Sequence, residues 1–103
     1  MKIIRVQYTT TQEYAARNKE NITKVMNELR EMNRSDIKYG AYLLPDGKTF
    51  MHFDQFENEE AHSLLTGLES FKKFSDELLA SHLEVEPKLE LLSLVSSSEN
   101  FFG

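Results

Sequence analysis

The stretch that decides the fold of this chain is residues 37–56, which read IKYGAYLLPDGKTFMHFDQF. Two runs rich in β-branched and aromatic residues, 37–44 and 49–56, flank the segment Pro45-Asp46-Gly47-Lys48. Asp-Gly between two such runs is typical of a β-hairpin with a two-residue loop, because a type I′ turn needs positive φ at both central positions. The sequence therefore predicts an antiparallel hairpin centred on Asp46 and Gly47.

A two-residue loop also fixes which side chains share a face of the hairpin. One face carries a mainly apolar set with two titratable side chains: Ile37, Tyr39, Ala41, Leu43, Phe50, His52, Asp54 and Phe56. The opposite face carries Gly40, Tyr42, Leu44, Thr49, Met51 and Phe53. Both faces are largely apolar, which is not the pattern of a sheet with water on one side. We therefore expect both faces to be covered.

A strand and a helix are predicted before the hairpin. Residues 3–9 alternate in character, which indicates a half-buried strand with Ile4, Val6 and Tyr8 on one face and Arg5 and Gln7 on the other. Thr10 followed by Glu13 has the spacing of a capping box and predicts a helix start. Apolar residues then recur at helical spacing: Ile22, Val25, Met26, Leu29 and Met32.

A second helix and a last strand are predicted after the hairpin. Asn58 is a suitable N-cap, and Glu59 and Glu60 suit the first turn of a helix. Gly67 weakens this helix, and Ser70 can cap a second segment that carries Phe71, Phe74, Leu78 and Leu79. Pro87 precedes a final strand predicted over residues 88–95.

The predicted order of strand, helix, two strands, helix and strand is the ferredoxin-like βαββαβ arrangement of the α+β class. It has a four-stranded antiparallel sheet with two helices on one face, in one domain over residues 1–96 with a tail over 97–103. We expect the helices to cover Ile4, Val6, Tyr8, Tyr42, Met51 and Phe53, because Arg5 and Gln7 would be costly to bury unpaired. The other face, with Ile37, Tyr39, Leu43, Phe50 and Phe56, is then expected to be buried in a homodimer.

Composition excludes several classes of function. The net charge is −5, which disfavours nucleic acid or an anionic membrane as the main partner. There is no cysteine, so disulfides, zinc-thiolate sites and thiol nucleophiles are excluded. The N-terminal run MKIIRVQYTT is too polar for a signal peptide, and a cytoplasmic location is expected.

The hairpin PDGKTF and the runs HFDQFENEEA and ESFKKFSDEL resemble the antibiotic-biosynthesis-monooxygenase-type dimeric α+β barrel proteins. The resemblance covers residues 2–95. It implies a homodimer in which two sheets face each other as a barrel, with a ligand cavity between sheet and helices in each subunit. Proteins of this family include cofactor-independent monooxygenases of polycyclic aromatics, haem-degrading oxygenases and quinol-oxidising proteins.

His52 and Asp54 form the best acid–base pair of the sequence. Their i, i+2 spacing places both on one strand face, where the carboxylate could orient the imidazole or raise its pKa. Tyr39 is expected opposite Asp54 and could add a phenol to the same cavity. The alternative is a structural role, with His52 hydrogen-bonded inside the barrel and Asp54 paired with Arg5 or Tyr39.

The function predicted from these features is cofactor-independent oxidation or isomerisation of a small aromatic molecule. The expected catalytic residues are His52 and Asp54, and the expected substrate contacts are Arg5, Gln7, Tyr39, Phe50 and Phe56. Arg5 and Gln7 serve equally well as pairs across a dimer interface. The alternative function is a non-catalytic homodimer that binds a small molecule or acts in a stress response.

No cofactor is expected. The sequence has no glycine loop for a nucleotide and no HxH or HExxH spacing for a metal. Haem-degrading relatives would have an Asn on the first strand and a Trp and a His on the second helix, whereas this chain has Gln7, no Trp, and only His82 at the end of a helix. We therefore expect no haem. Phe101 and Phe102 either dock on a partner subunit or fray.

Overall fold

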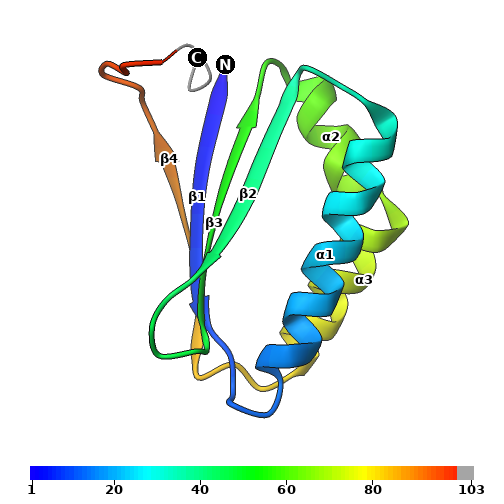
Figure 1. Cartoon of the computed structure of the whole chain (residues 1–103), viewed down its shortest axis with the longest axis vertical. Coiled ribbons are helices and arrows are strands. Elements are labelled where there is room, and N and C mark those ends of the chain that lie inside the picture. The colour runs from blue at the N-terminus through cyan, green and yellow to red at the C-terminus, as the bar shows by residue number, and fades with distance from the viewer. Residues whose placement is uncertain (100–103) are drawn as a thin grey trace.

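A computed structural model describes residues 1–99 of the chain. Four strands form one antiparallel sheet, β1 (Lys2–Thr9), β2 (Ile37–Leu43), β3 (Thr49–Phe56) and β4 (Val85–Leu92), in the spatial order β2-β3-β1-β4. Three helices, α1 (Ala15–Met32), α2 (Glu59–Gly67) and α3 (Glu69–Ala80), lie on one side of the sheet (Figure 1). The predicted ferredoxin-like fold is confirmed. The expectation for Phe101 and Phe102 lies outside the described residues.

The hairpin has the predicted register, but its turn is of another type. Leu43 lies opposite Phe50, as predicted. The Gly47 N–H donates to the Leu44 carbonyl at 3.0 Å, and Gly47 has a φ of 77°, whereas Asp46 has no positive φ. The turn is therefore not type I′, because Pro45 fixes a negative φ at the first central position and places Asp46, not Gly47, at the second.

The pairing of β1 with β3 decides which face of the hairpin the helices cover. Val6 lies opposite His52, and Tyr8 lies opposite Phe50. Directly opposite residues share a face, so the buried face of β1 brings Phe50 and His52 under the helices. The helices cover the predicted face of β1. They cover the opposite face of the hairpin from the one predicted. The covered side includes Ile37, Tyr39, Leu43, Phe50, Asp54 and Phe56, and the open side includes Tyr42, Met51 and Phe53.

The helix starts follow local capping, with one correction. Asn58 accepts a hydrogen bond from the Ala61 N–H at 2.9 Å, which confirms it as the N-cap of α2. The predicted cap at Thr10 is wrong. The Thr11 hydroxyl accepts from the Tyr14 N–H at 3.2 Å, whereas the Thr10 hydroxyl donates to the Thr11 carbonyl. Thr10 therefore lies between the end of β1 and the turn, and Thr11 opens the turn into α1.

The last strand begins earlier than predicted and contains Pro87. β4 spans Val85–Leu92 and pairs only with β1, at the edge of the sheet. The ladder changes register between Gln7 and Thr9, beside Pro87. An edge strand with such an irregularity tolerates proline, because no second neighbour needs its missing N–H. Leu89 and Leu91 of β4 stay 61% and 68% exposed.

Candidate functional site

A cavity of about 150 Å³ lies between the sheet and α3. The sheet contributes polar side chains to its wall: Tyr8, Tyr39, His52 and Asp54. The helix contributes a mainly apolar wall with Phe71, Phe74, Leu78 and Leu79. An apolar cavity of this volume holds one benzene ring. This cavity is therefore large enough for a single ring, with most of its polar groups on the sheet side and Ser75 on the helix side.

The strand register explains why these polar groups meet. Tyr39 on β2 lies directly opposite Asp54 on β3. His52 lies two residues before Asp54 and so points to the same face. Tyr8 reaches the site from β1, where its strand neighbour on β3 is Phe50. Three neighbouring strands thus supply the four polar groups.

A chain of hydrogen bonds runs from α1 through the site. The Asn18 Nδ2 donates to the Tyr8 hydroxyl at 2.8 Å. The Tyr8 hydroxyl lies 2.7 Å from His52 Nε2, and the Tyr39 hydroxyl lies 2.6 Å from His52 Nδ1. Both ring nitrogens of His52 are therefore bonded to phenols. The expected orientation of His52 by Asp54 is wrong, because Tyr8 and Tyr39 occupy both positions that the carboxylate could take.

Burial holds His52 neutral. It lowers the pKa of His52 to about 4, because the cationic ring would lose its hydration. Burial also raises the pKa of Tyr8, and burial together with the charge of Asp54 raises the pKa of Tyr39. At neutral pH the chain of hydrogen bonds therefore consists of neutral groups that can pass a proton but do not carry a charge.

Asp54 is the titratable group of the site that changes charge near neutral pH. Burial raises its pKa to about 7. Its Oδ1 atom is buried and has no hydrogen-bond partner. A carboxyl group whose pKa is near the working pH is well suited to general acid–base catalysis. The sequence assigned Asp54 to support His52, whereas the geometry makes Asp54 the better proton acceptor.

The other expected substrate contacts lie away from this cavity. Phe50 and Phe56 are buried core residues, with Phe50 stacked on Tyr8 at 5.7 Å and Phe56 stacked on His62 at 4.6 Å between ring centres. Arg5 and Gln7 lie on the open face and are hydrogen-bonded to each other. Arg5 also forms an ion pair of 2.6 Å with Glu90 of β4. His52, Asp54 and Tyr39 are the expected residues that the structure brings together.

Tyr8 and Asn18 were not predicted as site residues. The strand pattern places Tyr8 on the helix side with Ile4 and Val6 but carries no signal for the role of its hydroxyl. Asn18 follows Ala15 by three residues and precedes Ile22 by four, all three buried on one face of α1. A polar amide at such a core-facing position needs a buried partner, which was the available signal.

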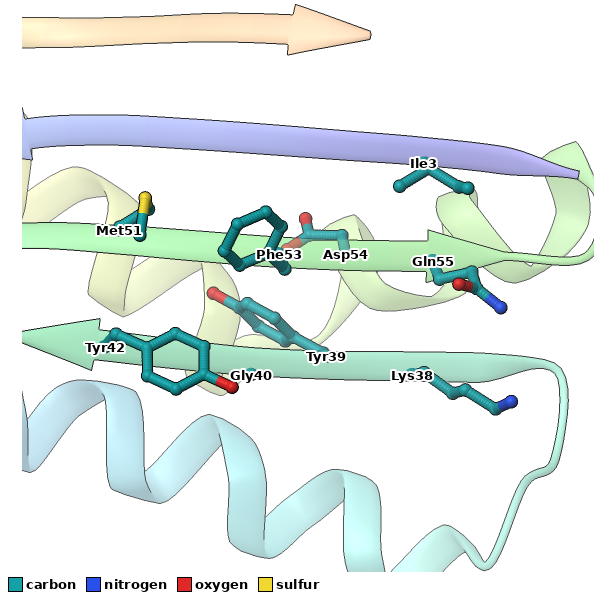
Figure 2. Close-up of a pocket in the computed structure, with 9 residues that line it drawn as sticks. All are labelled: Ile3, Lys38, Tyr39, Gly40, Tyr42, Met51, Phe53, Asp54 and Gln55. Carbon is teal, nitrogen blue, oxygen red and sulfur yellow. The ribbon is translucent and has the colours of Figure 1, made fainter. Parts of the chain in front are cut away.

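A second hollow of about 560 Å³ lies on the open face of the sheet (Figure 2). Its side chains come from β1, β2 and β3 and include Ile3, Tyr42, Met51 and Phe53. Gly40 deepens it, because a Cβ at this position would meet nothing within 4 Å. Tyr39 and Asp54 line both hollows, so the two lie on opposite sides of the same part of the sheet.

The described residues, 1–99, contain no group of three His, Asp or Glu side chains that could hold a metal ion. His82 is exposed in the loop after α3, with a φ of 62°, and so does not lie in the cavity. None of the helices described for residues 1–99 is long and apolar enough to cross a membrane.

Solved structures with the same fold exist, although neither a protein-family model nor a curated protein matches the sequence. An antibiotic biosynthesis monooxygenase superposes with a TM-score of 0.77 at 13% identity, over 93% of this chain and 100% of that one. Rv0793 from Mycobacterium tuberculosis gives a TM-score of 0.76 at 10% identity, over 95% and 98% of the two chains. PA3566 from Pseudomonas aeruginosa gives 0.75 at 16% identity, over 92% and 94%.

The chain therefore has the fold of the antibiotic biosynthesis monooxygenase-like proteins, as the resemblance of its hairpin and helix motifs implied. Each comparison covers nearly the whole of both chains, so the likeness extends to the complete βαββαβ unit.

Proposed function

We propose that this protein catalyses the cofactor-independent oxidation of a small aromatic molecule in the cavity between the sheet and α3. The observation that carries the proposal is the buried Asp54 carboxyl, with a pKa near neutrality and an unpartnered oxygen, beside the Tyr8–His52–Tyr39 chain. The fold of an antibiotic biosynthesis monooxygenase supports the same reaction class.

Asp54 would take a proton from an acidic hydroxyl of the substrate. The resulting anion is electron-rich and can pass electrons to O₂, which is the oxidant of this proposal. A quinol that gives two electrons and two protons becomes a quinone, and O₂ leaves as H₂O₂. A monooxygenation instead places one oxygen atom of O₂ in the substrate, which also gives up two hydrogen atoms with their electrons to reduce the other oxygen atom to water.

Oxygen uptake with catechol, hydroquinone and pyrogallol tests the proposal. Replacing the base with its neutral isostere, Asp54→Asn, is expected to lower turnover at least about a hundredfold, the usual contribution of a general base. His52→Ala should also lower turnover, because Tyr39 loses its partner. Lys24→Ala, on the exposed side of α1, is the control that should leave turnover unchanged. Equal turnover in wild type and Asp54→Asn contradicts the proposed role, and a peroxide assay separates the two reaction types.

The second candidate function is ligand binding without turnover. It is favoured by the fact that both ring nitrogens of His52 are already hydrogen-bonded, as in a structural histidine. Saturable binding of catechol with no oxygen uptake in any of these assays would support this function instead.

We also propose that the protein is a homodimer joined through the open face of the sheet. This face exposes the apolar groups of the hollow, including Tyr42, which is 61% exposed and packs edge-on against Phe53. The face differs from the one expected from sequence, but the reason is the same: uncovered apolar area favours association by about 25 cal/mol per Å² buried.

A further inference from the structure

The direction of the hydrogen bonds in the cavity follows from counting donors. A neutral imidazole has one N–H donor and one acceptor nitrogen, and a phenol has one donor. The Tyr8 oxygen already accepts from the amide of Asn18. Tyr8 is only 1% exposed, so water does not accept the proton of its hydroxyl. This proton must therefore go to a protein acceptor.

With the Asn18 amide nitrogen directed at Tyr8, two arrangements of the protons are conceivable. If His52 Nε2 carried the proton, Tyr8 would accept twice and its hydroxyl proton would be buried without a partner, which is unfavourable. If Tyr8 donates to Nε2, then His52 Nδ1–H donates to the Tyr39 oxygen. The Tyr39 proton is then left to point into the cavity, where Asp54 Oδ1 is an unpartnered acceptor. In the second arrangement the hydroxyl proton without a protein partner is that of Tyr39, which lines the cavity, instead of that of Tyr8, which is only 1% exposed.

We propose that Asn18 is a positioning residue that sets the direction of the Asn18–Tyr8–His52–Tyr39 chain, so that Tyr39 presents its hydroxyl proton to a bound ligand beside Asp54. The ligand class follows from this polarity and from the volume of about 150 Å³. It is a single-ring compound with an oxygen substituent, whose oxygen accepts from Tyr39. Where that oxygen carries a proton, Asp54 is placed to receive it. This ligand class makes the proposed function more specific. The binding of the ligand does not depend on the proposed function, whereas its turnover does.

The first test is the ¹⁵N spectrum of His52 in the labelled wild-type protein, which needs neither ligand nor turnover. The expected result is a neutral ring with a protonated Nδ1 and an unprotonated Nε2. A protonated Nε2 in the neutral wild-type ring would overturn the proposal, whatever the oxygen-uptake assays show. The absence of turnover with the expected spectrum would count against the proposed function alone.

Asn18→Asp tests the cause of this direction. At a pH where the new carboxyl is ionised, it accepts the Tyr8 proton, and His52 Nε2 is then expected to become protonated. Asn18→Leu is the matched control. Like the Asn18 amide nitrogen, leucine offers Tyr8 no acceptor, so Tyr8 should still donate to Nε2 and leave it unprotonated. An unprotonated Nε2 in a folded Asn18→Asp protein would overturn the role of Asn18. The wild-type spectrum remains decisive if this variant does not fold.

The binding of anisole and ethylbenzene tests the ligand class. The two molecules have nearly the same size, but only anisole has an oxygen, and that oxygen can only accept. Wild type is expected to bind anisole about tenfold more tightly, the effect of one hydrogen bond. Tyr39→Phe should abolish this difference. Equal affinities in wild type would overturn the assignment of Tyr39 as the donor to the ligand.

Discussion

His52 and Asp54 show how burial acts oppositely on an imidazole and a carboxyl. Both groups are kept neutral, so the pKa of His52 falls from 6.5 to about 4 and that of Asp54 rises from 3.8 to about 7. The residues lie on one strand face, two positions apart, but neither shift depends on the other. The cavity therefore contains a weak carboxylic acid and a neutral imidazole, and not a carboxylate that orients the imidazole or raises its pKa, as the spacing suggested.

These two shifts affect stability in opposite directions as the pH rises. Between pH 4 and 6.5 the unfolded chain holds a proton on residue 52 that the native state lacks, so rising pH stabilises the fold by about 3 kcal/mol. Between pH 3.8 and 7 the native state holds a proton on Asp54 that the unfolded chain has released, so rising pH destabilises the fold by about 4 kcal/mol. The two contributions nearly cancel where the windows overlap.

Asp54→Asn is therefore expected to gain stability over wild type as the pH rises from 4 to 7, by about 4 kcal/mol. His52→Gln should show the opposite trend, and lose stability relative to wild type between pH 4 and 6.5. Urea unfolding at a series of pH values measures both differences. A pH-independent difference for Asp54→Asn would show that this carboxyl titrates normally in the folded protein.

Among the elements, α2 has the clearest sequence signal. Asn58 caps its first turn, and Glu59 and Glu60 follow where negative charge suits the helix dipole. The break between α2 and α3 falls at Leu68, whose extended backbone ends one helix and starts the next. Ser70, expected as the second cap, donates instead to Glu28 of α1 and so joins two helices.

Removal of the cap in Asn58→Ala is expected to lower the free energy of unfolding by about 1 kcal/mol, because the Ala61 N–H loses its acceptor. Asn58→Asp keeps an acceptor at the same position and serves as the control, with little expected loss. Chemical denaturation of the three proteins measures the effect. Equal losses in both variants would mean that the hydrogen bond from Ala61 contributes nothing.

At the scale of the whole molecule, the helices leave one face of the sheet uncovered (Figure 1). That face contains the hollow around Gly40 and a cluster of hydrogen-bonded polar side chains, Arg5, Gln7 and Glu90. Arg5 is half-buried and already satisfied within its own chain, so a partner could cover it without leaving its charge unpaired.

The proposed dimer predicts that Phe53→Asp dissociates the protein, because it places a charge in the apolar part of the interface. Sedimentation equilibrium at micromolar concentration should give a dimer for wild type and a monomer for this variant. Lys24→Asp, on the exposed side of α1, is the control and should remain dimeric. A monomeric wild type would contradict the proposed assembly.

The sequence by itself determined the order of elements, the hairpin register and the cap at Asn58, because each depends on residues close together in the chain. The period-two pattern of residues 3–9 also identified the buried face of β1 correctly. The hairpin pattern did not determine which of its two faces the helices cover, because both faces are apolar.

Only the tertiary structure decided that choice, because the register of β1 against β3 joins residues about 46 positions apart and places Val6 opposite His52. This long-range pairing puts His52, Asp54 and Tyr39 beneath the helices, where burial shifts their pKa values and Asn18 of α1 reaches the site through Tyr8. The chemistry of the site therefore depends on contacts between four separate elements, whereas the spacing of His52 and Asp54 reports only that they share one strand face.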